Sequence, residues 1–186
     1  MTARRLSQVL AALVAAPLAA SGCGGDVDQT EAIAMSQGAV DGPAHGMTIH
    51  GGNGGTPTFN FLPVGEEHLS QWRMWGKVYV DALQMAYELP NGSLRITSKA
   101  GGNGGDLHTL SAWPSRHIVY TSGRSASWND DFCVVDDASN FACAGGSGGS
   151  SWGSEQVPSP VEDEIDGVSG KYGTYIDSLQ CWWYLY

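Results

Sequence analysis

Glycines and aspartates recur together along this chain, and their chemistry and spacing stand out. A Gly-Gly-x-Gly-Gly pattern occurs at residues 51–55, 101–105 and 145–149. Each copy leads through a β-rich stretch to an aspartate that opens a largely apolar strand, at Asp81, Asp131 and Asp177. The glycine copies are 50 and 44 residues apart and the aspartates 50 and 46 apart. Because the two spacings run in parallel, the chain contains an internal threefold repeat.

The paired motifs could hold a ligand that carries several hydroxyl groups. Glycine has no Cβ, so a ligand can approach its backbone N–H groups. An ionised aspartate beside that loop accepts hydrogen bonds from hydroxyls, and bonds to an ionised acceptor are the stronger kind. Each motif alone has a plainer explanation, since glycines turn the chain and aspartate caps a turn. Only their joint recurrence favours ligand binding.

The elements that position these residues are predicted to be strands. Segments between turns are short, rich in Val, Ile, Tyr, Trp and Thr, and bounded by Gly, Pro, Asn and Ser. No window carries an apolar period long enough for a helix. With three similar units, the sheets are expected to close around a pseudo-threefold axis, which leaves no apolar face exposed.

The first residues have the order of an export signal. Arg4 and Arg5 precede an apolar run, Val9–Ala20, that is too short to span a bilayer as a stable helix. Residues 1–22 are therefore predicted to be a signal peptide. It ends in Ala-Ser-Gly before Cys23, which resembles the bacterial lipobox and predicts lipidation of that cysteine. The protein would then be an exported lipoprotein facing the periplasm or the cell surface, or a secreted protein if the cysteine is incidental.

The rest of the chain divides into a tether and one domain. Residues 23–46 are acidic, small and polar, without a sustained apolar period, and are expected to form a flexible tether. Residues 47–186 are long enough for one domain with its own core.

Three cysteines follow Cys23. Cys133 and Cys143 flank the turn-rich segment 136–140, which could connect two antiparallel strands. In an oxidising compartment we expect this pair to form a disulfide. Cys181 would then remain as a buried free thiol in a core strand.

Composition argues against several classes of function. The net charge is −10 with only 9 Lys and Arg, so the clustered cations that nucleic-acid binding requires are missing. The histidines show neither metal-ligand spacing nor a nucleophile partner; they are His45, His50, His68, His108 and His117. Aspartates in three equivalent repeats would be held apart rather than paired for acid–base catalysis. We therefore expect no enzyme activity, no cofactor and no metal.

Residues 47–186 resemble the jacalin-related lectins. The resemblance is carried by the glycine-rich loops and by Gly173-Thr174-Tyr175-Ile176-Asp177, which matches the Gly-x-x-x-Asp sugar loop of that family. It implies an all-β fold, a β-prism of three Greek-key sheets with pseudo-threefold symmetry. It also implies that a sugar is held between this loop and a backbone N–H of a glycine-rich loop.

The resemblance assigns roles to individual residues. Asp177 would accept two sugar hydroxyls, while Thr174 and Tyr175 donate backbone N–H groups. Gly55 would donate a further N–H from the partner loop, and Gly173 opens the sugar loop.

A second carbohydrate site is implied in the first repeat, although Lys77 stands there at the glycine position. Its residues are Val78, Tyr79, Asp81 and Gly105. The corresponding stretch of the second repeat, 127–131, is expected to be structural, with Trp128 either packed or serving as a platform for a sugar.

The implied partners are glycans of the mannose or glucose type. Galactose-preferring members of the family use a free amino terminus created by chain processing, and nothing here suggests such a cut. A membrane would be contacted only through the lipid anchor, and the sequence leaves a homo-oligomer open. The alternative is a β-prism without sugar binding, resembling the vitelline-membrane outer-layer proteins, that contacts an envelope or extracellular protein.

Overall fold

The computed structural model describes residues 44–160 and 163–185. Within these ranges the chain forms fourteen strands and no helix. Accordingly, no helix that could span a bilayer occurs in the described part of the chain. The predicted signal peptide, Cys23 and most of the predicted tether lie outside the described residues.

The first sheet surrounds the hairpin of β4 (His68–Gly76) and β5 (Val80–Glu88). Strand β8 (Asp106–Ser111) pairs with β4 on one side. On the other side β5 pairs with two short strands, β6 (Leu94–Ile96) and β7 (Ala100–Gly101). The hairpin is therefore central and the later segments supply both edges.

The second sheet repeats this plan around β9 (Ile118–Ser125) and β10 (Asn129–Asp136). Strand β11 (Phe141–Gly145) pairs with β10, and β12 (Ser150–Gln156) pairs with β9. Cys133 on β10 lies directly opposite Cys143 on β11, and the two are joined by a disulfide.

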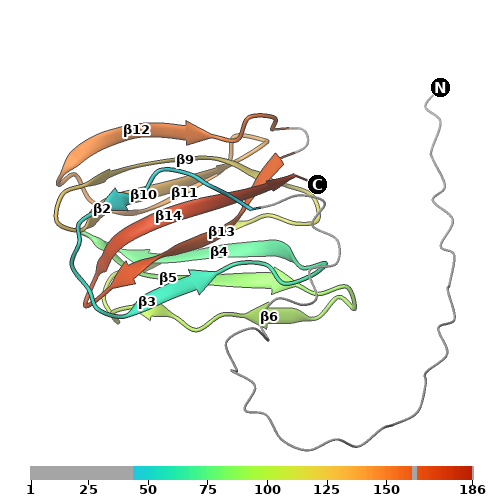
Figure 1. Ribbon diagram of the computed structural model, residues 1–186, viewed down its shortest axis with the longest axis horizontal. Coiled ribbons are helices and arrows are strands. Elements are labelled where there is room, and N and C mark those ends of the chain that lie inside the picture. The colour runs from blue at the N-terminus through green and yellow to red at the C-terminus, as the bar shows by residue number, and fades with distance from the viewer. Residues whose placement is uncertain (1–43, 161–162, 186) are drawn as a thin grey trace, which may run out of the picture. The chain divides into compact units, whose positions relative to one another are not determined.

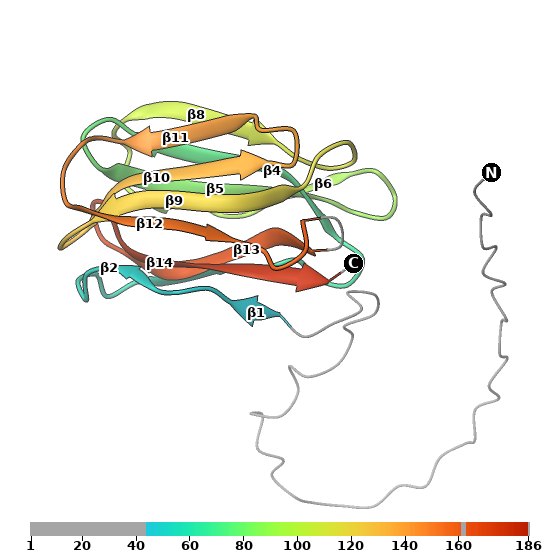
Figure 2. The same ribbon diagram turned by 90° about the horizontal axis from the view of Figure 1, so that it is seen from above.

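The third sheet combines both ends of the described chain. Its central hairpin is β13 (Asp163–Tyr172) and β14 (Ile176–Leu185). Its edges come from the N-terminal strands: β1 (His45–Gly46) and β2 (His50–Gly51) pair with β14, and β3 (Thr58–Phe61) pairs with β13. Figures 1 and 2 show these early strands beside the C-terminal hairpin. The ordered sheet thus begins two residues before the domain boundary predicted at residue 47.

Three sheets of the same plan enclose one core, as expected for an all-β prism. In each sheet a glycine-rich segment crosses from one edge strand to the other, which is the Greek-key connection. Trp72 from the first sheet contacts Phe132 from the second, with ring centroids 5.6 Å apart, and both are fully buried. Strand β10 alternates buried and partly exposed side chains, so one face lines the core and the other faces outward.

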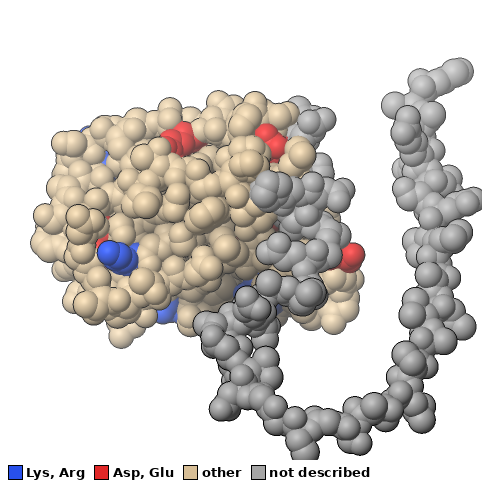
Figure 3. Space-filling model, in the orientation of Figure 1, with Lys and Arg blue, Asp and Glu red and all other residues tan. Residues whose placement is uncertain are grey.

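One face of the molecule carries few charges. The face shown in Figure 3 is largely uncharged, with isolated acidic and basic side chains and no basic patch.

Cys181 is a free thiol in the core, as predicted, and is 2 % exposed. Burial raises the pKa of its thiol.

Candidate functional site

Each glycine-rich loop crosses the end of a central hairpin and is fixed there by one backbone hydrogen bond. Gly52 N–H donates to the carbonyl oxygen of Asp177 at 2.9 Å. Gly102 and Gly146 make the same bond to Asp81 (2.9 Å) and Asp130 (2.7 Å). These three aspartates therefore occupy equivalent positions, at one end of the three sheets.

The aspartate predicted for the second repeat is wrong by one residue. The equivalent of Asp81 and Asp177 is Asp130, not Asp131, and a register irregularity between Asn129 and Asp131 accompanies the shift. A sequence signal for this exists. The residue two positions after the aspartate is a buried core residue in the other repeats, Leu83 and Leu179, and that rule selects Asp130 through the fully buried Phe132.

The carboxylate of Asp177 lies against the first glycine loop. A Cβ on Gly54 would overlap Asp177 Oδ1, and a Cβ on Gly55 would lie 2.7 Å from Asp177 Oδ2. Gly55 also has a φ of +70°, which favours glycine. The loop is therefore glycine-rich for two reasons here, its backbone conformation and the close approach of a carboxylate.

Asp177, the aspartate predicted to accept sugar hydroxyls, is largely buried. Its side chain does not face open solvent, since the residue is only 5 % exposed. Burial raises the pKa of its carboxyl, while a hydrogen bond from Gly173 N–H lowers it. An ionised carboxylate can accept further hydrogen bonds through its remaining lone pairs.

Thr174 and Tyr175 form the turn between β13 and β14, beside Asp177. Gly173 N–H donates to the carbonyl oxygen of Tyr175 at 2.9 Å, which closes the turn. Thr174 is exposed and Tyr175 is half-buried. The structure thus brings together Gly55, Gly173, Thr174, Tyr175 and Asp177, the residues predicted for the first carbohydrate site.

The first repeat has the same arrangement around Asp81. A Cβ on Gly104 would lie 2.5 Å from Asp81 Oδ1, and Gly105, with a φ of +73°, would place one 2.7 Å from Oδ2. Val78 and Tyr79 lie in the turn, which is closed by a bond from Lys77 N–H to the Tyr79 carbonyl at 3.3 Å. Burial raises the pKa of Asp81, and Lys99 lowers it.

Lys77 fits the turn position that Gly173 occupies in the third repeat. The φ of Gly173 is not in the left-handed region, and a Cβ there would meet nothing closer than 3.5 Å. The backbone therefore does not require glycine at this position, and Lys77 points its side chain to solvent. The second predicted site keeps its backbone geometry despite the substitution.

The second repeat differs through an arginine. Arg124 donates to the carbonyl oxygens of Gly148 (2.7 Å) and Gly149 (2.8 Å), so its guanidinium holds the third glycine loop. Asp130 is 5 % exposed and lies against that loop.

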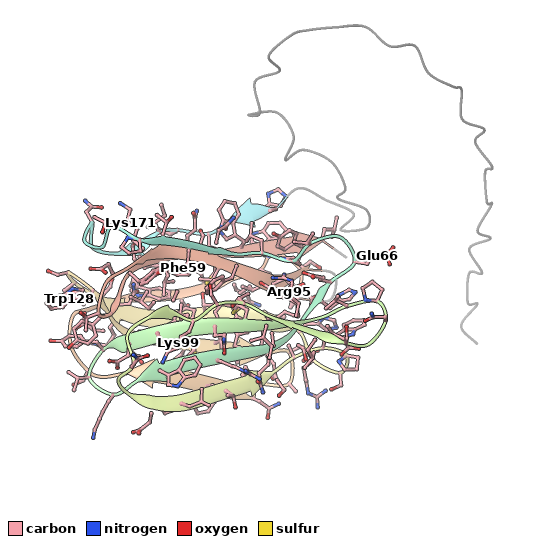
Figure 4. All side chains as sticks on the ribbon, turned by 90° about the horizontal axis from the view of Figure 1, so that it is seen from below. Phe59, Glu66, Arg95, Lys99, Trp128 and Lys171 are labelled. Carbon is pink, nitrogen blue, oxygen red and sulfur yellow. A yellow bond between two sulfur atoms is a disulfide. The ribbon has the colours of Figure 1, made fainter. Side chains whose placement is uncertain are left out.

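One aromatic residue from each turn meets at the centre of the three loops. Tyr79 lies 4.9 Å from Tyr175 and 5.3 Å from Trp128, measured between ring centroids, and Trp128 lies 5.9 Å from Tyr175. Trp128 remains 39 % exposed. Figure 4 shows Trp128 and Lys171 at this end, with Glu66 and Arg95 at the other. The contact among these three rings was not predicted from the sequence, because it depends on how the sheets close.

Comparison with solved structures identifies the fold. A lectin from Malaysian banana matches with a TM-score of 0.65 and 19 % identity, covering 77 % of this chain and 100 % of its own. The chain has the jacalin-lectin fold. A mannose-binding jacalin-related lectin from Ananas comosus matches with a TM-score of 0.64 and 20 % identity, covering 77 % and 99 %. Artocarpin, solved as a complex with mannotriose, matches with a TM-score of 0.62 and 13 % identity, covering 76 % and 98 %.

The structural similarity establishes the jacalin-lectin fold. No protein-family model matches the sequence, and no curated protein matches it by sequence.

Proposed function

We propose that this protein is a lectin that binds glycans of the mannose or glucose type at Asp177. The observation that carries the proposal is the carboxylate of Asp177 enclosed by Gly54 and Gly55 and flanked by the turn of Thr174 and Tyr175. This arrangement offers an acceptor for hydroxyl hydrogens beside backbone N–H donors for hydroxyl oxygens, which is the complement of two adjacent hydroxyls on a sugar ring.

Two further observations support this proposal. The fold is that of the jacalin-related lectins, among which the Ananas comosus protein is mannose-binding and artocarpin was solved with mannotriose. The surface in Figure 3 is also largely uncharged, which suits a neutral ligand. Asp81, with Val78, Tyr79 and Gly105, is proposed as a second site of the same kind.

The lipid anchor at Cys23 is part of the proposal, with export to the periplasm or the cell surface. Strand β1 joins the domain opposite Trp182 and Trp183, at the far end of β14 from Asp177. The tether would therefore meet the domain at the end of the third sheet opposite Asp177.

The test is a calorimetric titration of the purified protein with methyl α-mannoside. We expect saturable binding that is competed by glucose-type ligands and not by methyl α-galactoside. A protein that binds none of these sugars but is captured by an envelope protein would support the alternative, a β-prism without lectin activity.

A further inference from the structure

The end of the sheets opposite the glycine loops gathers three titratable side chains. His68, His117 and Glu164 lie 13 residues before Asp81, Asp130 and Asp177, respectively. The next residue in each repeat is a buried aliphatic side chain: Leu69, Ile118 and Ile165. These three positions are therefore equivalent under the threefold symmetry, which brings them together although no local motif contains any two of them.

Glu164 lies between the two histidines. It is 4 % exposed. Its Oε1 atom lies 3.8 Å from His68 Nδ1, and its Oε2 atom contacts His117 Nδ1. Asp166, 1 % exposed, joins the same cluster: one ligand atom from each of His68, Glu164 and Asp166 lies within 4.8 Å of the others.

We propose that His68, Glu164 and Asp166 bind a divalent transition-metal ion such as Zn²⁺. Imidazole nitrogen combined with carboxylate oxygens is a donor set that these ions accept. Donors at about 2.0–2.2 Å from an ion lie about 3–3.5 Å from one another. Binding therefore draws the three side chains together by about 1 Å, and the pair of His68 and Glu164 is already close to that spacing.

His117 is not one of the three proposed ligands but contacts one of them, Glu164. With one oxygen of Glu164 on the ion, His117 holds the other oxygen and so fixes the orientation of the carboxylate. Partners of this kind orient metal ligands and strengthen binding.

An open groove gives the ion access to His68. Its volume is about 430 Å³, and its lining residues are Glu66, His68, Glu88, Leu89, Pro90 and Trp113. The two glutamates make this approach acidic, which favours a cation. Trp113 stacks on His68 with ring centroids 4.0 Å apart, so the indole reports on events at this imidazole.

The sequence predicts no metal site, because its possible ligands do not stand at short spacing. His68 and Glu164 are 96 residues apart and belong to different repeats. Only the closure of the sheets makes them neighbours.

The test is calorimetric titration of Zn²⁺ into the untagged, chelator-treated full chain carrying Cys23→Ser, which removes a thiol outside the described residues. We expect one Zn²⁺ per chain. Glu164→Gln and Asp166→Asn should each weaken binding at least tenfold, and His108→Gln, a histidine outside the cluster, should leave it unchanged. A thermal melt of each variant verifies folding.

Fluorescence locates the ion. Co²⁺ binding should quench part of the tryptophan emission, and Trp113→Phe should remove this quenching while the heat of Zn²⁺ binding remains. The proposal is overturned if the parent takes up no Zn²⁺, if the folded Glu164→Gln variant binds Zn²⁺ as well as the parent, or if Ca²⁺ binds more tightly than Zn²⁺. The result is independent of lectin activity, because Asp177→Asn should retain Zn²⁺ binding.

Discussion

Asp177 is buried by a loop from the other end of the chain. Two glycines pack directly against its oxygens, so the side chain loses most of its exposure. The environment that raises its pKa also makes each hydrogen bond to it stronger than it would be in bulk water.

Replacing Asp177 with Asn should separate recognition from stability. The amide matches the carboxylate in size but loses the charge-assisted bonds, which are worth about 1.5–3 kcal/mol. We therefore expect mannoside affinity at this site to fall about tenfold or more, measured by calorimetry. Burial already disfavours the charged form, so thermal stability should stay within about 1 kcal/mol of the parent. If the variant binds mannoside as tightly as the parent, the sugar binds elsewhere.

Glu164 makes stability depend on pH. Its pKa in the folded state is about 8, raised from an ordinary value of 4.5. Between these two values the folded chain holds a proton that the unfolded chain releases, so the free energy of unfolding decreases as pH rises, by at most about 1.4 kcal/mol per pH unit. The lowered pKa of His68 acts in the opposite direction, at pH values below its ordinary pKa of 6.5.

The check is a series of thermal melts from pH 5 to pH 8 in the presence of a chelator. The parent should lose stability across this range, and Glu164→Gln, which cannot titrate, should lose much less. His117, Asp137 and Asp166 surround this carboxyl and remain in both proteins. Parallel curves for parent and variant would contradict the assignment.

At the level of elements, each glycine loop packs against the aspartate of the hairpin that it crosses. The loop at residues 51–55 passes over Asp177, so its shape and the position of the carboxylate depend on each other. A glycine outside these loops, Gly92, is constrained by its backbone conformation alone. Gly92, in the loop between β5 and β6, has a φ of +78° and no atom near a prospective Cβ.

This contrast gives a matched pair of substitutions. Gly92→Ala should cost about 1 kcal/mol through its positive φ alone and leave sugar binding unchanged. Gly55→Ala carries the same penalty and also pushes a methyl group towards Asp177 Oδ2, so it should cost more and weaken mannoside binding. Chemical denaturation and calorimetry measure both effects. Equal losses in stability with unchanged binding would contradict the proposed role of this loop.

Much of the element pattern could be predicted from the sequence, and the two errors have different causes. The three glycine loops and their spacing predicted the repeat, the short β-rich segments predicted an all-β fold, and the resemblance to jacalin-related lectins implied the prism. The adjacent acids Asp130 and Asp131 could not be distinguished by type, and the register irregularity that selects the first of them lies in the backbone. The burial of Asp177 was missed because it comes from a loop more than a hundred residues earlier in the chain.

For the molecule as a whole, the threefold plan provides more than one candidate site. Asp81 and Asp177 are each enclosed by glycines in the same way. The number of candidate sugar sites is therefore a property of the prism rather than of one loop. The contacts among Tyr79, Trp128 and Tyr175 hold the three turns together at this end.

Stoichiometry tests this directly. Native mass spectrometry with a mannoside should show two ligands per chain for the parent, one for Asp81→Asn or Asp177→Asn, and none for the double variant. A single ligand retained by the double variant would assign a site to Asp130. A parent that binds only one ligand would contradict the second site at Asp81.

The third sheet takes its edges from β1, β2 and β3 and its centre from β13 and β14. On the ribosome, the glycine loop at residues 51–55 is therefore made long before the hairpin it serves. The loops and hairpins around Asp81 and Asp130 come from neighbouring stretches of chain and can assemble early. The arrangement around Asp177 needs the final hairpin, so a chain stopped a dozen residues short of the end would lack β14 and leave β1 and β2 without the strand they pair with.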